Sequence, residues 1–292
     1  MTATLGRYKG SSMKLDIDLS GSLQNPTISP DGQWLLVTVW HEGYNEGEAD
    51  LHAVNLNDLT KIVHVTRVLS GCVNVSQPGL GSCWHKNGRL IFSSTKHGND
   101  WPCTIKPDGT DFTVLPGYHA SLAGYEPTFA PNGVDFAFEQ HKAGQEKDGT
   151  IVAMVGGTPV TLAEPDSRQP AWAPNNNRVV YQRRDGRKWN LWLVDFDSKT
   201  RRVGSRLQLT DGDEFTDATW NPSGDRVLCS SEGGLYEVLP NADPRLVAET
   251  RRPIKYLGAP SWLPDGKRIV AEADKHDDPE KGSGTWIELL TL

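Results

Sequence analysis

The sequence lacks any concentrated basic region. Its 37 acidic residues outnumber its 30 lysines and arginines, so the formal net charge is −7. Proteins that bind nucleic acids normally gather positive charge on one face, because they must neutralise phosphates. Here adjacent basic residues form only isolated pairs: Arg183-Arg184, Arg201-Arg202 and Arg251-Arg252. We interpret these pairs as solvated surface and expect no nucleic-acid partner.

Long apolar segments are also missing. No apolar run approaches the roughly 20 residues that a helix needs to span a bilayer. The first twenty residues contain no apolar core of a secretory signal. We therefore expect no membrane association and a cytoplasmic, monomeric protein.

Cysteine is scarce, and several familiar motifs are absent. The four cysteines show no C-x-x-C spacing: Cys72, Cys83, Cys103 and Cys229. In the cytosol such residues are reduced thiols that mostly pack in the interior. There is no G-x-S-x-G, no glycine-rich phosphate loop and no calcium-hand spacing. These absences argue against an appended serine hydrolase domain and against a nucleotide or other organic cofactor.

The sequence does contain a repeat that occurs six times. Each copy contains a turn of the P-D-G type, followed by an apolar strand. We take the first residue of this turn as the register position of the copy. The register positions are Pro30, Lys86, Pro131, Pro174, Pro222 and Pro264. They are separated by 56, 45, 43, 48 and 42 residues. A period of about 40–50 residues with alternating strands and turns is typical of β-propellers.

Each copy predicts the parts of one blade. A large apolar residue stands two positions before the register position, where it can pack between neighbouring blades: Ile28, Trp84, Phe129, Trp172, Trp220 and Trp262. The turn favours a tight hairpin, and apolar strands follow it. We predict an all-β, six-bladed β-propeller of four-stranded antiparallel blades that occupies residues 1–292 as a single domain. The predicted blades are 22–69, 80–116, 125–163, 168–210, 216–249 and 258–292.

The sixth copy has no fourth strand of its own. The strand-like segment 13–19, MKLDIDL, precedes the first copy. We predict that this segment supplies the missing strand and closes the ring, since an open ring leaves strand edges unpaired.

The repeat resembles that of TolB-like propellers. The resemblance rests on the segments SWLPDGKRIV at 261–270, LWLVD at 191–195 and LT at 209–210. It covers nearly the whole chain and implies the propeller fold. Proteins with similar repeats include the interaction domain of TolB, the gating propellers of prolyl oligopeptidase-type proteases, and oligogalacturonate lyases.

One mouth of the central channel is the expected place for a site. In each blade the loop before the inner strand and the loop after the second strand lie at the same face. The residues just before the six inner strands are Asn25, Gly81, Glu126, Gln169, Asp217 and Ala259. Four of them have hydrogen-bonding side chains, which either cap strand ends and hold channel water or line a binding site.

Histidines recur at this mouth in three consecutive blades. His41 and His97 follow the register position by 11 residues, and His141 follows it by 10. Arg184 takes this place in blade 4, and His119 and His276 lie in nearby loops.

These histidines allow three interpretations. Three imidazoles suit a divalent metal such as Mn, Zn, Fe or Ni, with Ca as a further candidate when oxygen ligands join them. Glu126 or Asp217 would then complete the set of His41, His97 and His141. Alternatively, one histidine is a general base while Arg184 neutralises a substrate carboxylate. The third interpretation is that they are ordinary surface residues.

Two functions follow from these observations. The leading one is a small-molecule enzyme with its site at the channel mouth. The resemblance to oligogalacturonate lyases implies lyase-type or other acid–base chemistry, with or without metal, on a polar or acidic substrate. The alternative is a non-catalytic, TolB-like platform that binds a protein partner on its rigid loop face.

Overall fold

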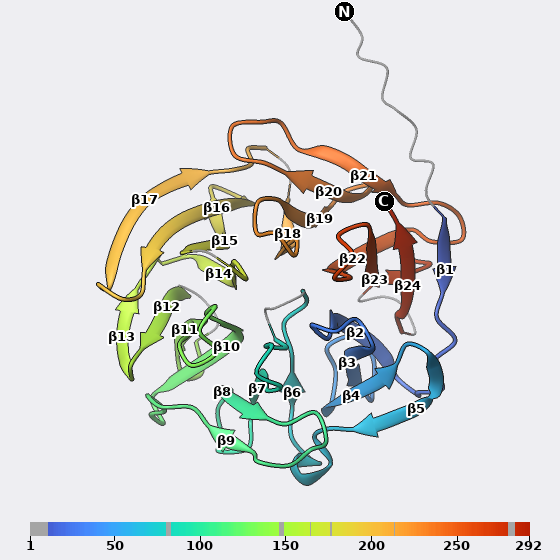
Figure 1. The fold of residues 1–292 in the computed structure, drawn as a ribbon, viewed down its shortest axis with the longest axis horizontal. Coiled ribbons are helices and arrows are strands. Elements are labelled where there is room, and N and C mark those ends of the chain that lie inside the picture. The colour runs from blue at the N-terminus through green and yellow to red at the C-terminus, as the bar shows by residue number, and fades with distance from the viewer. Residues whose placement is uncertain are drawn as a thin grey trace, which may run out of the picture.

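The computed structural model describes residues 11–79, 83–145, 149–163, 165–175, 177–212, 214–279 and 284–292. They form six four-stranded antiparallel sheets around a central axis (Figure 1). The predicted six-bladed propeller is therefore confirmed. The helical part of the described chain is a short 3-10 turn at Arg67–Leu69, and no described helix is long and apolar enough to cross a membrane.

The strands run from the axis outward in each of the first five blades. Blade 1 contains β2 (Ser22–Ile28), β3 (Trp34–Trp40), β4 (Ala49–Asn55) and β5 (Asp58–His64). Blade 2 contains β6 (Asn74–Val75), β7 (Leu90–Ser94), β8 (Trp101–Ile105) and β9 (Thr113–Val114). Blade 3 contains β10 (Leu122–Phe129), β11 (Phe136–Lys142), β12 (Thr150–Val155) and β13 (Thr158–Thr161).

The remaining blades follow the same order. Blade 4 contains β14 (Ser167–Trp172), β15 (Arg178–Asp185), β16 (Lys188–Asp197) and β17 (Arg202–Gln208). Blade 5 contains β18 (Thr216–Trp220), β19 (Val227–Ser231), β20 (Gly234–Val238) and β21 (Arg245–Glu249). Blade 6 contains β22 (Tyr256–Trp262), β23 (Arg268–Asp274), β24 (Trp286–Thr291) and β1 (Ser12–Lys14).

The N-terminal segment closes the ring. β1 pairs antiparallel with β24, with Met13 opposite Leu289, and the two strands lie side by side at the outer edge of blade 6 (Figure 1). The Leu15 amide extends the pairing by donating to the Ile287 carbonyl at 2.9 Å. The paired strand is shorter than the predicted 13–19, and the residues after it pack their side chains against blades 1 and 6.

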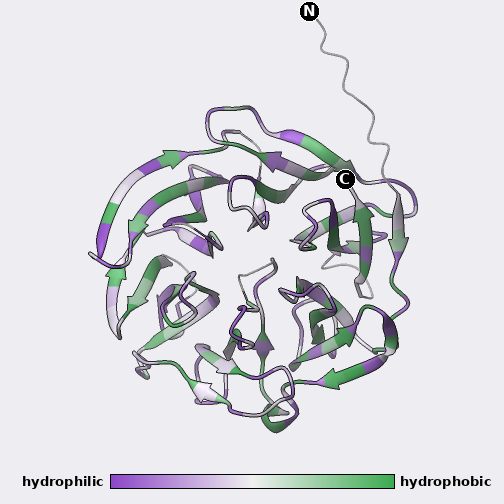
Figure 2. Cartoon of the chain, viewed as in Figure 1, coloured by the Kyte–Doolittle hydropathy of each residue, from purple (hydrophilic) through white to green (hydrophobic). Residues whose placement is uncertain are grey.

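The core lies between the blades. The large apolar residue two positions before each register position is buried in all six blades, as the repeat predicts. Trp220 of blade 5, for example, packs against Val180 and Leu191 of blade 4, and its indole N–H donates to the Ala171 carbonyl at 2.9 Å. Figure 2 shows hydrophobic residues recurring along the strands of every blade. The large apolar residues before the register positions therefore pack neighbouring sheets against each other.

The two mouths of the channel differ in chemistry. The hairpins that carry the register positions form one mouth, which we call the lower mouth. There Trp84, His85 and Phe129 join all six register residues around a cavity of about 200 Å³. The opposite end, where inner strands begin and second strands end, is the upper mouth.

A β-bulge interrupts five of the six inner strands at the same place. The pairing with the second strand shifts between residues such as Gln24 and Thr27 or Tyr125 and Thr128, and the same shift occurs in blades 4, 5 and 6. The bulged residue has a positive φ in each case: Asn25 50°, Glu126 48°, Gln169 50°, Asp217 53° and Ala259 44°. Non-glycine residues rarely adopt this conformation, and bulges of this kind re-aim a side chain.

Blade 2 departs from this pattern. Its inner strand begins at Asn74, ahead of residue 80 where the repeat placed the start of the blade. The chain after β6 runs toward the centre of the ring (Figure 1), and the Gln77 carbonyl accepts a hydrogen bond from Thr27 at 2.9 Å. Gly81, the expected counterpart of the bulged residues, lies outside the described residues.

Candidate functional site

The bulged residues and a second set of polar residues together form what we call the channel ring. The second set stands eight residues after each register position: Thr38, Ser94, Glu139, Gln182, Ser230 and Glu272. In the five bulged blades this residue lies directly opposite the one that precedes the bulged residue. The fold therefore gathers these polar side chains at one level of the structure.

Part of this polarity serves the bulge itself. A bulge withdraws one backbone N–H from the strand ladder, and that N–H needs another acceptor. The amide of Gln169 donates to Glu139 Oε2 at 3.4 Å, and the amide of Asn25 donates to Glu272 Oε2 at 3.2 Å. Each acceptor belongs to the preceding blade, so the side chains also connect neighbouring blades.

Gln169 joins two carboxyl groups across three blades. Its Nε2 donates to Glu126 Oε1 at 3.0 Å and to Asp217 Oδ1 at 3.2 Å. Its Oε1 accepts hydrogen bonds from Gln182 Nε2 and, at 3.1 Å, from the Asp217 amide. All hydrogen-bonding positions of this amide that face the ring are in use, so its orientation is fixed.

Asp217 is surrounded by donors. Besides Gln169, its carboxyl faces Ser230 Oγ at 3.2 Å, Thr216 Oγ1 at 3.1 Å and the Ala259 amide at 3.4 Å, all at Oδ2. Four donors therefore surround this carboxyl group, which matches the number of acceptor sites on its two oxygens. Asp217 is half-buried and retains access to the channel.

Glu126 has the opposite environment. Burial raises its pKa from 4.5 to about 8, and the nearby charges of Glu139 and Asp217 raise it further. The hydrogen bond from Gln169 and the charge of Arg168 oppose this shift without cancelling it. Near neutral pH the ring therefore holds Glu126 protonated, with Gln169 between it and Asp217.

Glu272 is a second protonated carboxyl, on the other side of Asp217. Burial and the charge of Asp217 raise its pKa to about 8. Tyr44, from the loop between β3 and β4, reaches across from blade 1 and donates to Glu272 Oε1 at 3.2 Å. The phenol of Tyr256 fills the space that a Cβ at residue 258 would take, which explains the glycine there. Burial raises the pKa values of both tyrosines.

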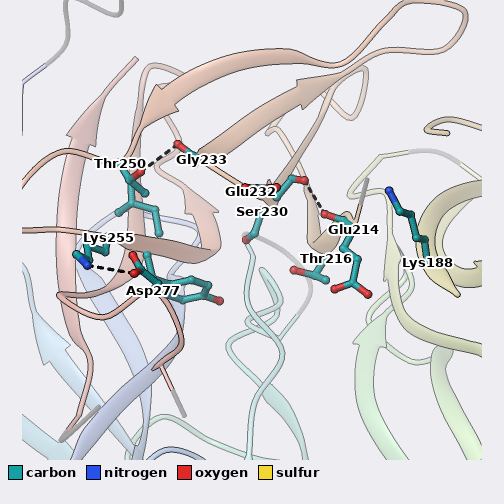
Figure 3. A pocket seen from close by; sticks show the side chains of 13 residues that line it. Lys188, Glu214, Thr216, Ser230, Glu232, Gly233, Thr250, Lys255 and Asp277 are labelled. Atoms are coloured by element: carbon teal, nitrogen blue, oxygen red, sulfur yellow. Dashed lines mark hydrogen bonds and ion pairs between the residues drawn. The ribbon is translucent and has the colours of Figure 1, made fainter. Parts of the chain in front are cut away.

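A cavity of about 780 Å³ opens at the upper mouth beside Asp217. Its inner wall includes Thr216, Ser230 and Tyr256, and the first two also hydrogen-bond Asp217. Figure 3 shows Lys188 and Glu214 at one end of the cavity and the Lys255–Asp277 ion pair at the other. A pocket of this size accommodates a ligand as large as a small oligosaccharide or a drug-sized molecule.

The three registered histidines have separate partners. His41 Nε2 lies 3.2 Å from Asp50 Oδ2, and His64 Nε2 lies 3.2 Å from the other oxygen of the same carboxylate. These contacts belong to the outer strands of blade 1. His97 is exposed, and its carbonyl accepts a hydrogen bond from Tyr118.

His141 is the histidine that reaches the channel ring. It is buried, and its Nε2 lies 2.5 Å from Glu139 Oε1. The other oxygen of Glu139 accepts a hydrogen bond from the Gln169 amide. His141 therefore holds Glu139 in the position from which Glu139 contacts the ring. Its ring also meets Tyr125 edge to face, with centroids 5.4 Å apart.

The other predicted residues lie around the upper mouth. His119 is exposed, with Nδ1 2.7 Å from Ser121 Oγ. His276 follows β23, and its amide donates to Asp274 Oδ1 at 2.9 Å. Arg184 is exposed at the end of β15.

Sequence reasoning missed Glu139, Gln182, Glu272 and Tyr44. A signal for the first three was present, because the position eight residues after each register position is polar in all six copies. A polar residue repeated within an otherwise apolar buried strand indicates a shared polar layer. Tyr44 gave no such signal, since its contact spans 228 residues of sequence.

The donor chemistry of the ring bears on the predicted metal. In the described part of the chain, no group of three His, Cys, Asp or Glu residues is placed to hold a metal ion. The Nε2 of Gln169 lies between Glu126 and Asp217 and donates to both carboxyl groups. Metal binding by His41, His97, His141 and Glu126 stays a prediction.

No protein-family model and no curated protein matches this sequence. Solved structures do match its fold. A gluconolactonase from Xanthomonas campestris has a TM-score of 0.66 at 12% identity, with 99% of this chain and 90% of that chain covered. Regucalcin from Agrobacterium tumefaciens, described as calcium-binding, has a TM-score of 0.63 at 14% identity, with 96% and 93% covered.

A putative TolB from Agrobacterium tumefaciens has a TM-score of 0.57 at 15% identity, with 92% of this chain and 90% of that chain covered. At these identities the likeness shows the six-bladed fold. The resemblance to TolB-like propellers therefore holds at the level of the fold, in company with propellers that are enzymes.

Proposed function

We propose that this protein is a small-molecule enzyme that performs acid–base chemistry at the channel ring, of the lyase type, on a polar or acidic substrate. The observation that carries the proposal is the pairing of a carboxyl group held protonated, Glu126, with a multiply hydrogen-bonded carboxylate, Asp217, on the two sides of one Gln169 amide. The adjacent cavity and the fold shared with a gluconolactonase support it.

In the proposed mechanism Asp217 is the base and Glu126 is the acid. Asp217 takes a proton from a substrate carbon next to a carboxylate or carbonyl group. The electron pair of that C–H bond forms a C=C bond, and the bond to the leaving oxygen breaks. That oxygen takes the proton of Glu126. Asp217 ends protonated and Glu126 ionised, and exchange with channel water restores both.

Glu126 suits the role of acid better than Glu272. Both carboxyls have a pKa of about 8, but Glu272 is 1% exposed and held by Tyr44. Glu126 is only half-buried and faces the channel. Glu272 instead lies close enough to Asp217 for the two charges to interact, so its neutral state limits the negative charge that the ring must hold.

The proposal is tested with a panel of uronate-containing oligosaccharides and sugar lactones. Elimination is followed by the ultraviolet absorbance of the unsaturated product, and lactone hydrolysis by acid release. We expect E126Q and D217N to lose about 10²–10³-fold in kcat, the usual contribution of a positioned acid or base, while circular dichroism shows a folded protein. The matched control is E249Q, at an exposed glutamate on β21.

The pH profile and a chelator separate the possible outcomes. The wild-type rate is expected to fall as pH rises through about 8, because Glu126 then loses its proton. The assay is repeated with chelator and with added Ca²⁺, Mn²⁺ or Zn²⁺, and a rate that requires the ion decides for the predicted metal. Full activity in D217N contradicts the proposal.

A further inference from the structure

We infer that the upper edge of blade 4 is an anion-binding wall that holds a carboxylate or phosphate group of the substrate. The wall consists of Arg168, Arg184 and Trp189. The inference rests on the proposed function in one respect: the wall would bind the charged end of the substrate that reacts at the channel ring.

The register of blade 4 brings these residues together. Arg168 lies opposite Gln182, and Arg184 lies opposite Trp189. Side chains two residues apart on a strand point to the same face, so Gln182 and Arg184 share a face with their partners. The guanidinium carbon of Arg168 lies 4.0 Å from the Trp189 ring centroid, and that of Arg184 lies 5.4 Å from it. The indole therefore holds two cations near each other.

Most of the donors on these cations remain available. Arg168 uses its Nε to reach Gln182 Oε1 at 2.6 Å, which leaves its two terminal nitrogens without a partner among the described residues. The side chain of Arg184 contacts the Trp189 ring and has no hydrogen-bond partner among the described residues. A guanidinium stacked on an aromatic ring keeps its N–H groups in the ring plane and exposed at its edge, which suits a bidentate oxyanion.

Among the described residues, no carboxylate forms an ion pair with Arg168 or Arg184. Asp185 is the acid of the same hairpin, and it is engaged elsewhere: its carboxylate accepts from Trp192 Nε1 at 2.9 Å and lies 3.8 Å from Arg183 Nε. Glu214 lines the cavity together with Lys188. Lys188, next to Trp189 on β16, places this edge of blade 4 at that end of the cavity.

The wall is adjacent to both the ring and the cavity. Arg168 acts on Glu126 electrostatically, and its partner Gln182 donates to Gln169. Gln169 in turn hydrogen-bonds Asp217, and Thr216 and Ser230, which also contact Asp217, line the cavity. A protonated Glu126 suits this arrangement, because it does not repel the incoming negative group.

Three sugars that differ only at carbon 6 test the inference: galactose, galacturonate and galactose 6-phosphate. Binding to the full chain is measured by calorimetry and by the fluorescence of its tryptophans. We expect at least one anionic sugar to bind at least tenfold more tightly than galactose. The tighter of the two identifies carboxylate or phosphate as the group that the wall accepts.

R184Q supplies the residue-level test. We expect it to weaken the preferred anionic sugar at least tenfold, in line with the loss of a charge-assisted hydrogen bond, and to leave galactose unchanged. The matched control is R202Q, which removes one charge from the exposed start of β17. Both residues are exposed, so neither substitution should unfold the protein.

The outcomes also separate this inference from the proposed function. Three results would contradict the anion-binding wall. They are equal affinity for all three sugars, no binding of either anionic sugar at 10 mM (about the range of a single weak ion contact), and an R184Q protein that still prefers the anionic sugar. A D217N protein that does not turn over substrate but still prefers the anionic sugar supports the wall. An active enzyme without that preference refutes the wall and leaves the ring chemistry in place.

Discussion

Replacing Glu126 by Gln should change how stability depends on pH. Glu126 has a pKa of about 8 in the folded protein and an ordinary value of 4.5 when unfolded. Below pH 4.5 both states hold the proton, and the group has no effect on the free energy of unfolding. Between pH 4.5 and 8 only the folded state holds it, so stability falls as pH rises, and it levels off above pH 8.

The size of the effect follows from the same shift. At about 1.4 kcal/mol per tenfold change in proton affinity, the upper limit is about 5 kcal/mol. Glu126 is only half-buried, so we reduce this to about 2 kcal/mol. Gln fits the backbone, since Gln169 has a φ of 50° at the corresponding position of blade 4. Its carbonyl oxygen can still accept the bond from Gln169.

The assay compares denaturant unfolding of wild type and E126Q from pH 5 to 9. The two curves should nearly coincide at pH 5 and diverge until the variant is more stable by about 2 kcal/mol near pH 9. The difference between the two proteins removes titrations common to both, such as that of His52, whose pKa burial lowers to about 4. E249Q is the control and should follow wild type. Parallel curves for E126Q and wild type would show that Glu126 ionises normally, and the proposed acid would be lost with it.

Two further predictions concern the fold. Deleting residues 1–19 removes β1 and leaves the edge of β24 unpaired, so the melting temperature should fall and light scattering should rise on heating; an unchanged melt would show that closure by β1 is dispensable. The four cysteines are free thiols. Burial raises the pKa of Cys83 and Cys103 to about 12 and also raises that of Cys229. Thiol titration without reductant should therefore find at most Cys72 reacting rapidly in the native protein and four thiols after denaturation, whereas a smaller total would reveal a disulfide.

The fold was predictable because the repeat encodes it locally. A hairpin turn, a large apolar residue before it and an apolar strand after it recur within each copy, and each element needs only its own segment to be recognised. Closure was predictable for a related reason: five complete blades and one incomplete blade leave one place for segment 13–19. Only the length of β1 differed.

The site was less predictable because it depends on the backbone. The residues before the inner strands were identified as a set, but nothing in their sequence indicates that five of them adopt positive φ in a bulge. Because of the bulge, the polar side chains of the ring come from the interior of the strands, where Glu139 and Glu272 lie. His41 and His97 lie outside it, in the loops. The spacing of the histidines predicts how far along each strand they lie. It does not predict which face of the blade each side chain occupies, and that face decides its partners.

Under the proposed function, the same residues of the ring have a structural and a chemical role, which accounts for the composition of the ring. Each bulge frees an N–H that must find an acceptor, and Glu139, Gln169, Asp217 and Glu272 supply acceptors to the next blade. Structure alone requires only an acceptor, which Thr or Ser also provides, as Thr38 does for the Ser76 amide at 3.2 Å. Carboxyl groups cost more to bury than hydroxyls, and the raised pKa values of Glu126 and Glu272 express that cost. Under the proposed function, these ionisable groups exchange protons with a bound molecule, which neutral acceptors cannot do.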